Sequence, residues 1–477
     1  MLFTSITYFL FLIPSLVLYY LIPQKIRNYF LILISALFYI YVKVDYIFII
    51  LFIIICNYFL GIGIEKAKNE TKQLLYFYLS LIINLGILIF FKYWNFLIIN
   101  IFELAGYVNN APVKQMPLLD LILPLGLSYY IFQTIGYITD VHRGSIKAER
   151  SIFRFALFTL FFPKLLVGPI ERANHFLPQL KRMVVFRMEN IIEGGKRIAW
   201  GLFKKLVVAD RIAIYHTAVI TSADHQSGAT LFFASILYTF QIYADFSGYT
   251  DIALGTAKLF GYDLLENFRR PLFSKNISDF WRRWHISLSS WVNDYIFNPI
   301  TLKHRNWGKW SLFYGLMISF IVIGIWHGAA WNYVLFGIIQ ALALMYEGLT
   351  KKIRKKFSKK INLRIYNPIS ILITFLFITF SLIIFQSNTL NDAINIITRI
   401  FTHHGDFFYD KPSTLLFMLI GCSFMMLYEF QEEWKIFPFS LFSNKSWVVQ
   451  QLSYSLLLIY ILIAGVFDGG QFIYFAF

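Results

Sequence analysis

Residues 311–360 read SLFYGLMISFIVIGIWHGAAWNYVLFGIIQALALMYEGLTKKIRKKFSKK. Two apolar runs, at 311–326 and 329–349, are separated by a short polar break, and each is close to the roughly 20 residues that a helix needs to cross a bilayer. The last ten residues contain seven Lys or Arg and no acid, which marks a cytoplasmic segment by the positive-inside rule. The stretch therefore predicts a transmembrane hairpin with both feet in the cytoplasm.

The composition of the whole chain also indicates a membrane protein. Of its 477 residues, 58% are apolar and 14% are charged, whereas a soluble domain is nearer half apolar and a quarter charged. This composition excludes a disordered chain, a collagen-like repeat, a coiled coil and a disulfide scaffold. The net charge of +17 is typical of basic cytoplasmic loops, and no basic face alternates with aromatic residues outside the apolar segments, so no nucleic-acid partner is expected.

Long apolar stretches recur along the chain without a soluble domain between them. Candidate spans lie at 2–22, 28–42, 46–64, 74–92, 118–138, 152–170, 229–246, 311–326, 329–349, 366–386, 413–430 and 452–467. Three further segments, 95–115, 190–215 and 274–300, mix apolar, aromatic and charged residues, as re-entrant or interfacial helices do. We therefore expect an all-α polytopic membrane protein with about 11–12 transmembrane helices plus re-entrant and interfacial helices.

These spans are expected to form a single integral-membrane domain over residues 1–477. It divides into N-terminal spans at 1–115, a core at 116–350 and C-terminal spans at 351–477. Counting spans onward from the basic end of the hairpin places the C-terminus outside the cytoplasm. Residues 1–22 lack a basic leader region and a cleavage signal, so they are expected to form a retained span rather than a signal peptide.

The polar break of the hairpin contains a candidate catalytic histidine. His327 lies in GIWHGAAWN at 324–332, and a helix rising from residue 310 would place it roughly 25 Å above the cytoplasmic foot. Trp326 and Trp331 would wall a cavity around its imidazole, with Asn332 beside them. A core histidine satisfied by hydrogen bonds is the alternative, but ionisable groups at membrane depth usually serve function, and histidine suits proton transfer near neutral pH.

A second group of aromatic and basic residues lies upstream. Residues 279–295 read DFWRRWHISLSSWVNDY, and at helical spacing Trp281, Trp284 and His285 fall near one face with Arg282 on its flank. An interfacial helix anchored by tryptophan and arginine is the alternative. A histidine on the aromatic face is harder to explain as an anchor, which favours a functional role for His285.

A third segment, QIYADFSGYTD at 241–251, interrupts an apolar span with carboxylates and hydroxyls. Such a break is tolerated only where it is buried in protein or faces water. Asp245 or Asp251 could pair with an arginine or orient a histidine, and a buried ion pair without a catalytic role is the open alternative. Gln241 belongs to the same candidate group.

Other chemistry finds no support in the sequence. The chain has no GxxxxGK[ST], HExxH, CxxC or GxSxG pattern, which argues against nucleotide hydrolysis, a zinc protease or a serine hydrolase. Its two cysteines, Cys56 and Cys422, lie far apart in apolar stretches. We therefore expect no metal site.

Taken together, the motifs resemble the membrane-bound O-acyltransferase (MBOAT) family. The segments 241–295 and 324–337 are similar to the bacterial branch that contains alginate O-acetyltransferase and the peptidoglycan O-acetyltransferase membrane subunit. Further similar stretches are LPLGLSYYIFQTIGYITDVHRG at 123–144, FFPKLLVGPIERANHFLPQL at 161–180, GLFKKLVVADRIA at 201–213 and the terminal FIYFAF. The chain departs from the family pattern at Asn293, where arginine is common, and at 299–302, where Pro-Leu-Gly-Gly is common.

The resemblance implies an MBOAT-like fold with His327 and His285 as catalytic residues. His327 would be the general base, and His285 would position substrate or stabilise developing charge, with Asp245 as its possible orienter. A covalent acyl-histidine is the rival scheme. The residues expected to bind or orient substrate are Asp245, Gln241, Trp281, Arg282, Trp284, Trp326, Trp331 and Asn332.

The resemblance further implies a donor, an acceptor, a partner and a location. Cytosolic acetyl-CoA would be the acyl donor substrate, with no permanently bound cofactor, and its phosphates could be attracted by Lys204, Lys205, Lys303 and Arg305. The acceptor would be a polysaccharide outside a bacterial inner membrane, reached through a periplasmic SGNH-type acetyltransferase. Peptidoglycan is preferred to alginate or another exopolysaccharide because the Lys-, Ile-, Asn- and Phe-rich composition suggests an AT-rich bacterium. A secondary transporter or channel is the alternative from another class.

Overall fold

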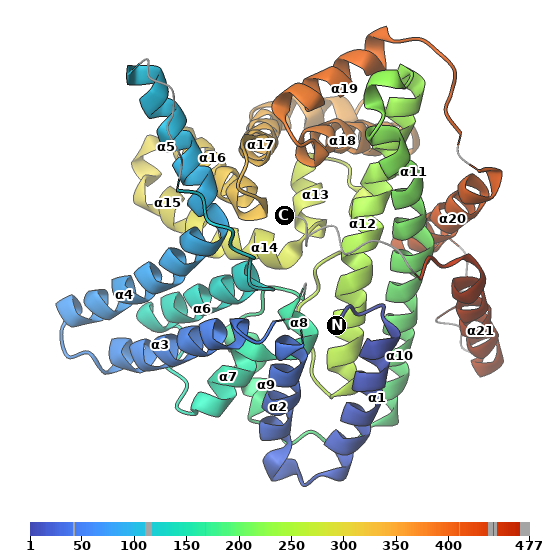
Figure 1. The fold of residues 1–477 in the computed structure, drawn as a ribbon. Helices are drawn as coiled ribbons and strands as arrows, with labels where there is room; N and C mark the ends of the chain where they lie inside the picture. The colour runs from blue at the N-terminus through green and yellow to red at the C-terminus, as the bar shows by residue number, and fades with distance from the viewer. Residues whose placement is uncertain are drawn as a thin grey trace.

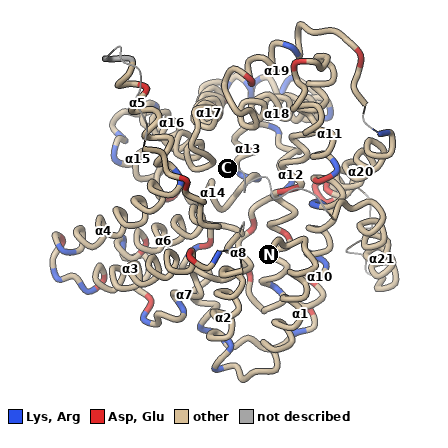
Figure 2. Tube along the Cα trace, viewed as in Figure 1, with Lys and Arg blue, Asp and Glu red and all other residues tan. Residues whose placement is uncertain are grey.

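The computed structural model describes residues 1–41, 43–109, 117–166, 168–409, 411–436, 442 and 446–467. Every regular element within these ranges is a helix (Figure 1), which confirms the predicted all-α fold. Charged residues are sparse along most of the trace (Figure 2). The terminal FIYFAF motif lies outside the described residues.

Seven helices in the described ranges are long and apolar enough to cross a membrane, and each overlaps a predicted span. They are α3 (Tyr46–Lys66), the continuous run Glu70–Gly106, α16 (Lys309–His327), α17 (Trp331–Ser358), α18 (Leu363–Gln386), α20 (Pro412–Trp434) and α21 (Trp447–Ala464). The protein is therefore a multi-pass membrane protein, as its composition predicted.

Other predicted spans form shorter or interrupted helices. α2 (Arg27–Ile40) has 14 residues, and the region 152–170 is divided between α7 (Ile152–Leu160) and α8 (Phe162–Leu165). At about 1.5 Å per residue, none of these helices alone crosses a hydrocarbon core of about 30 Å. Pro163 explains the break between α7 and α8, because proline has no N–H to continue the hydrogen-bond ladder of α7.

Of the segment 95–115, predicted as re-entrant or interfacial, residues 95–109 instead continue a membrane helix, and 110–115 lie outside the described residues. α4 (Glu70–Leu88) passes through the π-helical turn η2 (Ile89–Tyr93) into α5 (Trp94–Asn109), and the path changes direction near that turn (Figure 1). A π turn bends a helix without ending it, which is why the mixed composition of this segment misled the sequence analysis.

A buried polar cluster joins the first membrane helices to α6 (Leu127–His142). Asn84 Nδ2 donates to Asn57 Oδ1 over 2.8 Å, and Ser80 Oγ donates to the same oxygen over 2.7 Å. Thr134 Oγ1 of α6 donates to Asn84 Oδ1 over 2.8 Å. Because such groups have no water partners inside the protein, these bonds fix how α3, α4 and α6 pack.

The segment 190–215, predicted as re-entrant or interfacial, has a buried centre and a partly exposed first helix. It forms α10 (Met188–Leu202), the π-helical η3 (Phe203–Ala209) and the start of α11 (Asp210–Ile220). These elements run beside α12 (Gly228–Leu259), as the neighbouring vertical helices of Figure 1 show. All residues of η3 are buried, so this part is interior rather than interfacial.

Two glycine pairs bring α10 and α12 into close contact. A Cβ added to Gly201 would lie 2.6 Å from the carbonyl oxygen of Gly248, and one added to Gly194 would lie 2.7 Å from that of Gly255. Larger residues would separate the two backbones, so this seam depends on glycine.

The segment 274–300 does not form one long helix. It is divided into α13 (Ile277–Arg283), α14 (Ile286–Val292), η6 (Asn293–Phe297) and the start of α15 (Asn298–Lys303). In Figure 1, α13 and α14 lie near the centre, with the N-terminal helices and α16–α19 around them. The remaining helices are α1 (Ile6–Leu21), η1 (Gln24–Ile26), α9 (Ala173–Leu180), η4 (Ala223–His225), η5 (Pro271–Phe273), η7 (Arg305–Trp307) and α19 (Leu390–Thr402).

Candidate active site

A glycine-mediated contact between α16 and α17 places His327. A Cβ on Gly324 would lie 2.2 Å from the carbonyl oxygen of Tyr333, and one on Gly337 would lie 2.1 Å from that of Phe320. The two helices therefore pack backbone to backbone, as the predicted hairpin requires. His327 is the last residue of α16 and is 3% exposed, so the hairpin carries its imidazole into the protein interior.

His285 lies in the break between α13 and α14. Its φ of 44° and ψ of 52° are left-handed, a conformation that costs residues with a Cβ roughly 1–2 kcal/mol. The side chain is fully buried, and neither ring nitrogen has a hydrogen-bond partner among the described residues. A strained backbone and a buried, unsatisfied imidazole occurring together are typical of a functional residue.

Asn267 fixes the chain immediately after His285. Ile286 N donates to the carbonyl oxygen of Asn267 over 2.9 Å, and Ser287 donates to Asn267 Oδ1 from its N (3.1 Å) and its Oγ (2.8 Å). Ser287 Oγ also accepts a bond from Ile170 N over 3.0 Å. These bonds hold the left-handed turn in place. The sequence analysis missed Asn267 because nothing in its local sequence distinguishes it.

The fold brings the two predicted catalytic histidines together. The ring centroids of His285 and His327 are 6.5 Å apart. Trp326 lies 5.4 Å from His285, Phe246 lies 4.8 Å from His285, and Phe385 lies 5.1 Å from His327. The two imidazoles therefore lie close together among aromatic rings, and we call this surrounding the aromatic chamber.

A narrow cavity of about 20 Å³ reaches His327. Trp281 and Trp284 line it, as does Leu272. One water needs about 10–15 Å³ by the same measure, so the cavity holds little more than one. The structure thus brings three predicted tryptophans to the site: Trp281 and Trp284 at the cavity and Trp326 against His285.

Three other predicted site residues do not line the cavity at His327. Trp331 is 57% exposed and donates from Nε1 to Asn100 Oδ1 over 2.8 Å, so it does not wall the cavity as predicted. At the start of α17 its side chain packs toward α5 instead. Asn332 Nδ2 donates to the carbonyl oxygen of Ser387 over 2.7 Å and joins α17 to the end of α18. Arg282 is exposed on α13.

Asp245 forms an ion pair, which is the alternative that the sequence left open. Lys205 Nζ lies 2.7 Å from Asp245 Oδ1 and 2.8 Å from Asp210 Oδ1, and all three side chains are buried. The pairing with Lys205 explains why the Asp245 carboxylate can be buried, and no role in orienting His285 is needed for this explanation. Gln241, one turn earlier in α12, is buried, and its Oε1 has no hydrogen-bond partner among the described residues.

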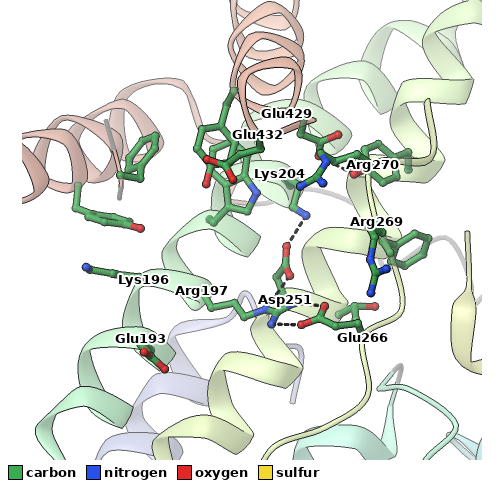
Figure 3. A pocket seen from close by; sticks show the side chains of 17 residues that line it. Glu193, Lys196, Arg197, Lys204, Asp251, Glu266, Arg269, Arg270, Glu429 and Glu432 are labelled. Atoms are coloured by element: carbon green, nitrogen blue, oxygen red, sulfur yellow. Dashed lines mark hydrogen bonds and ion pairs between the residues drawn. The ribbon is translucent and has the colours of Figure 1, made fainter. Parts of the chain in front are cut away.

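A separate charged pocket of about 600 Å³ lies between α10, α12, α20 and the connection before α13 (Figure 3). Its charged lining residues are Lys196, Arg197, Lys204, Arg269, Arg270, Glu193, Asp251, Glu266, Glu429 and Glu432. Asp251 pairs with Lys204 and, over 3.0 Å, with Arg197, whose guanidinium also lies 2.6 Å from Glu266. Most of the positive charge in this pocket is therefore neutralised locally.

This pairing corrects the predicted attraction of phosphates to Lys204 and Lys205. Both ammonium groups are buried against carboxylates, so neither is available as a surface attractor. Two other cations of the pocket are better placed. Lys196 donates to Gln450 Oε1 over 2.8 Å, and the exposed Arg269 forms no ion pair among the described residues.

Lys92 is a further residue that the sequence analysis did not select. It lies in η2 and contacts the end of α16 that carries His327. The available signal was a single lysine inside a long apolar stretch, because ionisable residues at membrane depth are rare without a function.

Comparisons with known proteins agree with this architecture. Residues 145–387 match the model of the MBOAT, membrane-bound O-acyltransferase family. The chain is 32% identical over 400 residues to an alginate O-acetylase of Pseudomonas putida, covering 84% of this chain and 80% of the relative.

Two other relatives carry different names. A peptidoglycan O-acetyltransferase of Helicobacter pylori is 30% identical over 425 residues, covering 83% of this chain and 78% of the relative. A teichoic acid D-alanyltransferase of Bacillus subtilis is 30% identical over 286 residues, covering 58% of this chain and 72% of the relative. These names favour an acyltransferase over the transporter or channel alternative. The protein is thus an O-acyltransferase enzyme and belongs to the membrane-bound O-acyltransferase family, in the branch of the alginate and peptidoglycan enzymes.

Proposed function

We propose that this enzyme transfers an acetyl group from cytosolic acetyl-CoA to a hydroxyl outside the membrane, with His327 as general base, and so serves the O-acetylation of an extracytoplasmic polysaccharide. The observation that carries the proposal is the buried pair of His285 and His327, whose ring centroids are 6.5 Å apart in an aromatic chamber. A neutral imidazole is the ordinary side chain best suited to accept a proton near pH 7.

In the proposed reaction, His327 takes the proton of the acceptor hydroxyl while the hydroxyl oxygen attacks the thioester carbonyl. The new C–O bond forms as the C–S bond breaks, and the leaving thiolate receives the proton from His327. His285 donates a hydrogen bond to the carbonyl oxygen as negative charge develops on it, a role supported by its unpartnered ring nitrogens. The aromatic walls keep out competing water.

Two features support a cytoplasmic donor site at the charged pocket. Leu363 at the start of α18 and Trp434 at the end of α20 line one apolar groove of about 670 Å³, so these helix ends lie on the same side. The basic segment 351–360 directly precedes Leu363, and Glu432 of the charged pocket lies within one turn of Trp434. The positive-inside rule assigns that side to the cytoplasm, where Lys196 and Arg269 would attract the donor phosphates. The same rule puts the C-terminus outside.

The proposed acceptor is peptidoglycan, and the proposed location is a bacterial inner membrane. The similarity to the peptidoglycan O-acetyltransferase of Helicobacter pylori supports this choice, while the alginate O-acetylase of Pseudomonas putida supports alginate or another exopolysaccharide as the alternative. A periplasmic SGNH-type acetyltransferase would complete the transfer onto the polysaccharide. No permanently bound cofactor is needed for the chemistry described, because acetyl-CoA acts as a substrate.

The test uses the purified full chain in detergent or nanodiscs with acetyl-CoA and an acceptor that carries a free hydroxyl, and it measures release of the free thiol. We expect His327→Ala to lower the turnover rate by about 10²–10⁴-fold, the usual contribution of a general base. His225→Ala, which alters an exposed histidine, serves as the matched control and should keep wild-type activity. An active and folded His327→Ala protein would falsify the catalytic assignment.

A second measurement addresses donor and acceptor together. Cells that lack the protein should lose O-acetyl groups from peptidoglycan and regain them with the wild-type gene but not with His327→Ala. If these cells keep O-acetylated peptidoglycan but lose O-acetyl groups from an exopolysaccharide, the acceptor is that exopolysaccharide and not peptidoglycan. If the cells instead lose ester-linked D-alanine and keep their O-acetyl groups, the proposal that acetyl-CoA is the donor is wrong.

A further inference from the structure

Lys92 is an ionisable residue in the middle of a long apolar helix. It belongs to the π-helical turn η2 within the continuous run Glu70–Gly106, between Phe91 and Tyr93. A lysine at membrane depth costs roughly 2.5–3.5 kcal/mol on insertion scales, and such residues usually have a function. π turns are also common at functional sites, because the extra residue re-aims the side chains of one turn.

The side chains of this turn bind the last carbonyl groups of α16. Lys92 Nζ donates to the carbonyl oxygen of Trp326 over 2.7 Å and to that of His327 over 3.2 Å. Tyr93 OH donates to the carbonyl oxygen of Ile325 over 2.7 Å. Two consecutive residues of η2 therefore bind three consecutive carbonyls at the helix end that carries the catalytic histidine.

These contacts satisfy a specific physical need. The last four carbonyls of an α-helix have no partner within the helix, and they form the negative end of its dipole. A cation that donates to them neutralises this end and fixes the last turn. A lysine that merely reached for the membrane surface would extend its ammonium toward water. Here the ammonium is bonded inside the protein and also lies 5.8 Å from the ring centroid of Trp326.

We propose that Lys92 is a positioning residue for His327, with Tyr93 in a supporting role. By holding the last turn of α16, Lys92 sets where the imidazole of His327 lies relative to His285 and to the substrate. The inference rests on the proposed function, because it assumes that His327 performs the chemistry. It assigns Lys92 no contact with substrate.

The experiment compares three substitutions of Lys92 in the purified full chain. Lys92→Met removes both the charge and the hydrogen bonds, Lys92→Gln keeps donor groups without the charge, and Lys92→Arg keeps both. We expect Lys92→Met to lower kcat by about 10–100-fold, because a misplacement of about 1 Å can cost that much, with the KM for acetyl-CoA unchanged. Lys92→Arg should recover kcat to within a few-fold of wild type, and Lys92→Gln should lie between them.

The control is Lys72→Met, because Lys72 lies exposed on the same continuous helix and should tolerate the change. Wild-type kcat in Lys92→Met would overturn the proposal. So would a Lys92→Arg protein as slow as Lys92→Met, since a positioning cation should be replaceable by another. If Lys92→Met does not assemble, Tyr93→Phe removes one carbonyl contact alone and should lower kcat about 3–10-fold; an unchanged kcat there counts equally against the proposal.

His327→Ala is measured in parallel to separate two kinds of failure. An active His327→Ala protein refutes the catalytic role of His327 and with it the proposed function. An inactive His327→Ala protein beside a fully active Lys92→Met protein refutes only the role of Lys92.

Discussion

His327 and His285 are close in space, but the chain holds them in opposite ways. His327 ends a regular helix of 19 residues, and the final carbonyls of that helix accept hydrogen bonds from Lys92 and Tyr93. His285 lies in a left-handed break between two helices of seven residues each, and Asn267 binds the residues that follow it.

The difference concerns where a change would disturb the site. A helix end moves with the whole helix, so the position of His327 depends on the glycine seam between α16 and α17 as well as on the bonds from Lys92 and Tyr93. A strained turn depends on the few hydrogen bonds that over-determine it, so the position of His285 depends on single residues. The two imidazoles should therefore respond to different substitutions, although they share one chamber.

The largest effect expected beyond His327 itself is at His285. His285→Ala should lower kcat by about 10²–10³-fold, the usual cost of losing a donor to developing charge. His285→Asn tests whether the imidazole or the strained backbone matters, because asparagine adopts the left-handed region more readily. We expect His285→Asn to fold at least as well as His285→Ala and to be equally slow in the thiol-release assay. Wild-type turnover in either variant would reduce His285 to a structural residue.

Removal of the hydrogen bonds that Asn267 forms with Ser287 should give the next largest effect. Asn267→Leu keeps a similar volume but deletes the oxygen that accepts two bonds from Ser287. We expect kcat to fall about 10–100-fold, because the turn that positions His285 loses its support. Unfolding monitored by intrinsic fluorescence should show a stability loss of about 1–3 kcal/mol. Full activity would mean that the turn is held without Asn267.

The support of His327 is tested through stability. A Cβ on Gly337 would meet the carbonyl oxygen of Phe320 at 2.1 Å, whereas the nearest atom to a Cβ on Gly348, in the same helix, is 4.0 Å away. Gly337→Ala should therefore destabilise the protein by about 1–3 kcal/mol. Gly348→Ala should be neutral or slightly stabilising by comparison. Equal melting temperatures for the two variants would contradict the backbone contact.

The smallest effect is expected at His175 in α9, outside the membrane-spanning helices. His175 Nδ1 is 2.7 Å from Glu171 Oε1, and this bond raises the pKa of His175 above its ordinary value. Because the folded pKa is raised, the added stability is fully present below about pH 6.5 and is lost as pH rises through the folded pKa.

The size of this effect is limited by solvent. The His175 side chain is 36% exposed, so after allowance for screening the pair should contribute only about 0.5 kcal/mol. The free energy of unfolding of wild type should therefore be higher at pH 5.5 than at pH 8 by this contribution, and His175→Ala should remove that contribution. A pH dependence of unfolding identical in both proteins would contradict the assignment.

Seven of the predicted spans and the hairpin that carries His327 are found in the described residues, and the reason is local. Seven runs of about 20 apolar residues can only be satisfied as helices in lipid, and a polar break between two of them identifies the hairpin that ends at His327. His285 was selected by its place among the tryptophans of 279–295, and the family motifs then implied its catalytic role.

The features that the sequence did not predict depend on partners distant along the chain. The break at His285 has no local signal, because neither glycine nor proline stands between α13 and α14 to mark it. Lys204 and Lys205 resemble surface attractors until folding places Asp251 and Asp245 against them. Trp331 was assigned to the cavity by its distance in sequence from His327, but its direction from the helix takes it toward α5.

The paired charges of the pocket in Figure 3 have one further consequence, for ion selectivity. An anion that binds Arg197 must exchange places with a carboxylate, because Arg197 is already bound by Asp251 and Glu266. A single inorganic anion gains little from this exchange, since the displaced carboxylate is left without its counterion in a partly buried place. A ligand with several charged groups and an aromatic surface can offset that loss against the rings of Tyr243 and Phe268, which also line the pocket. From this counterion exchange we expect the pocket to discriminate by the shape of a polyanion as well as by its charge.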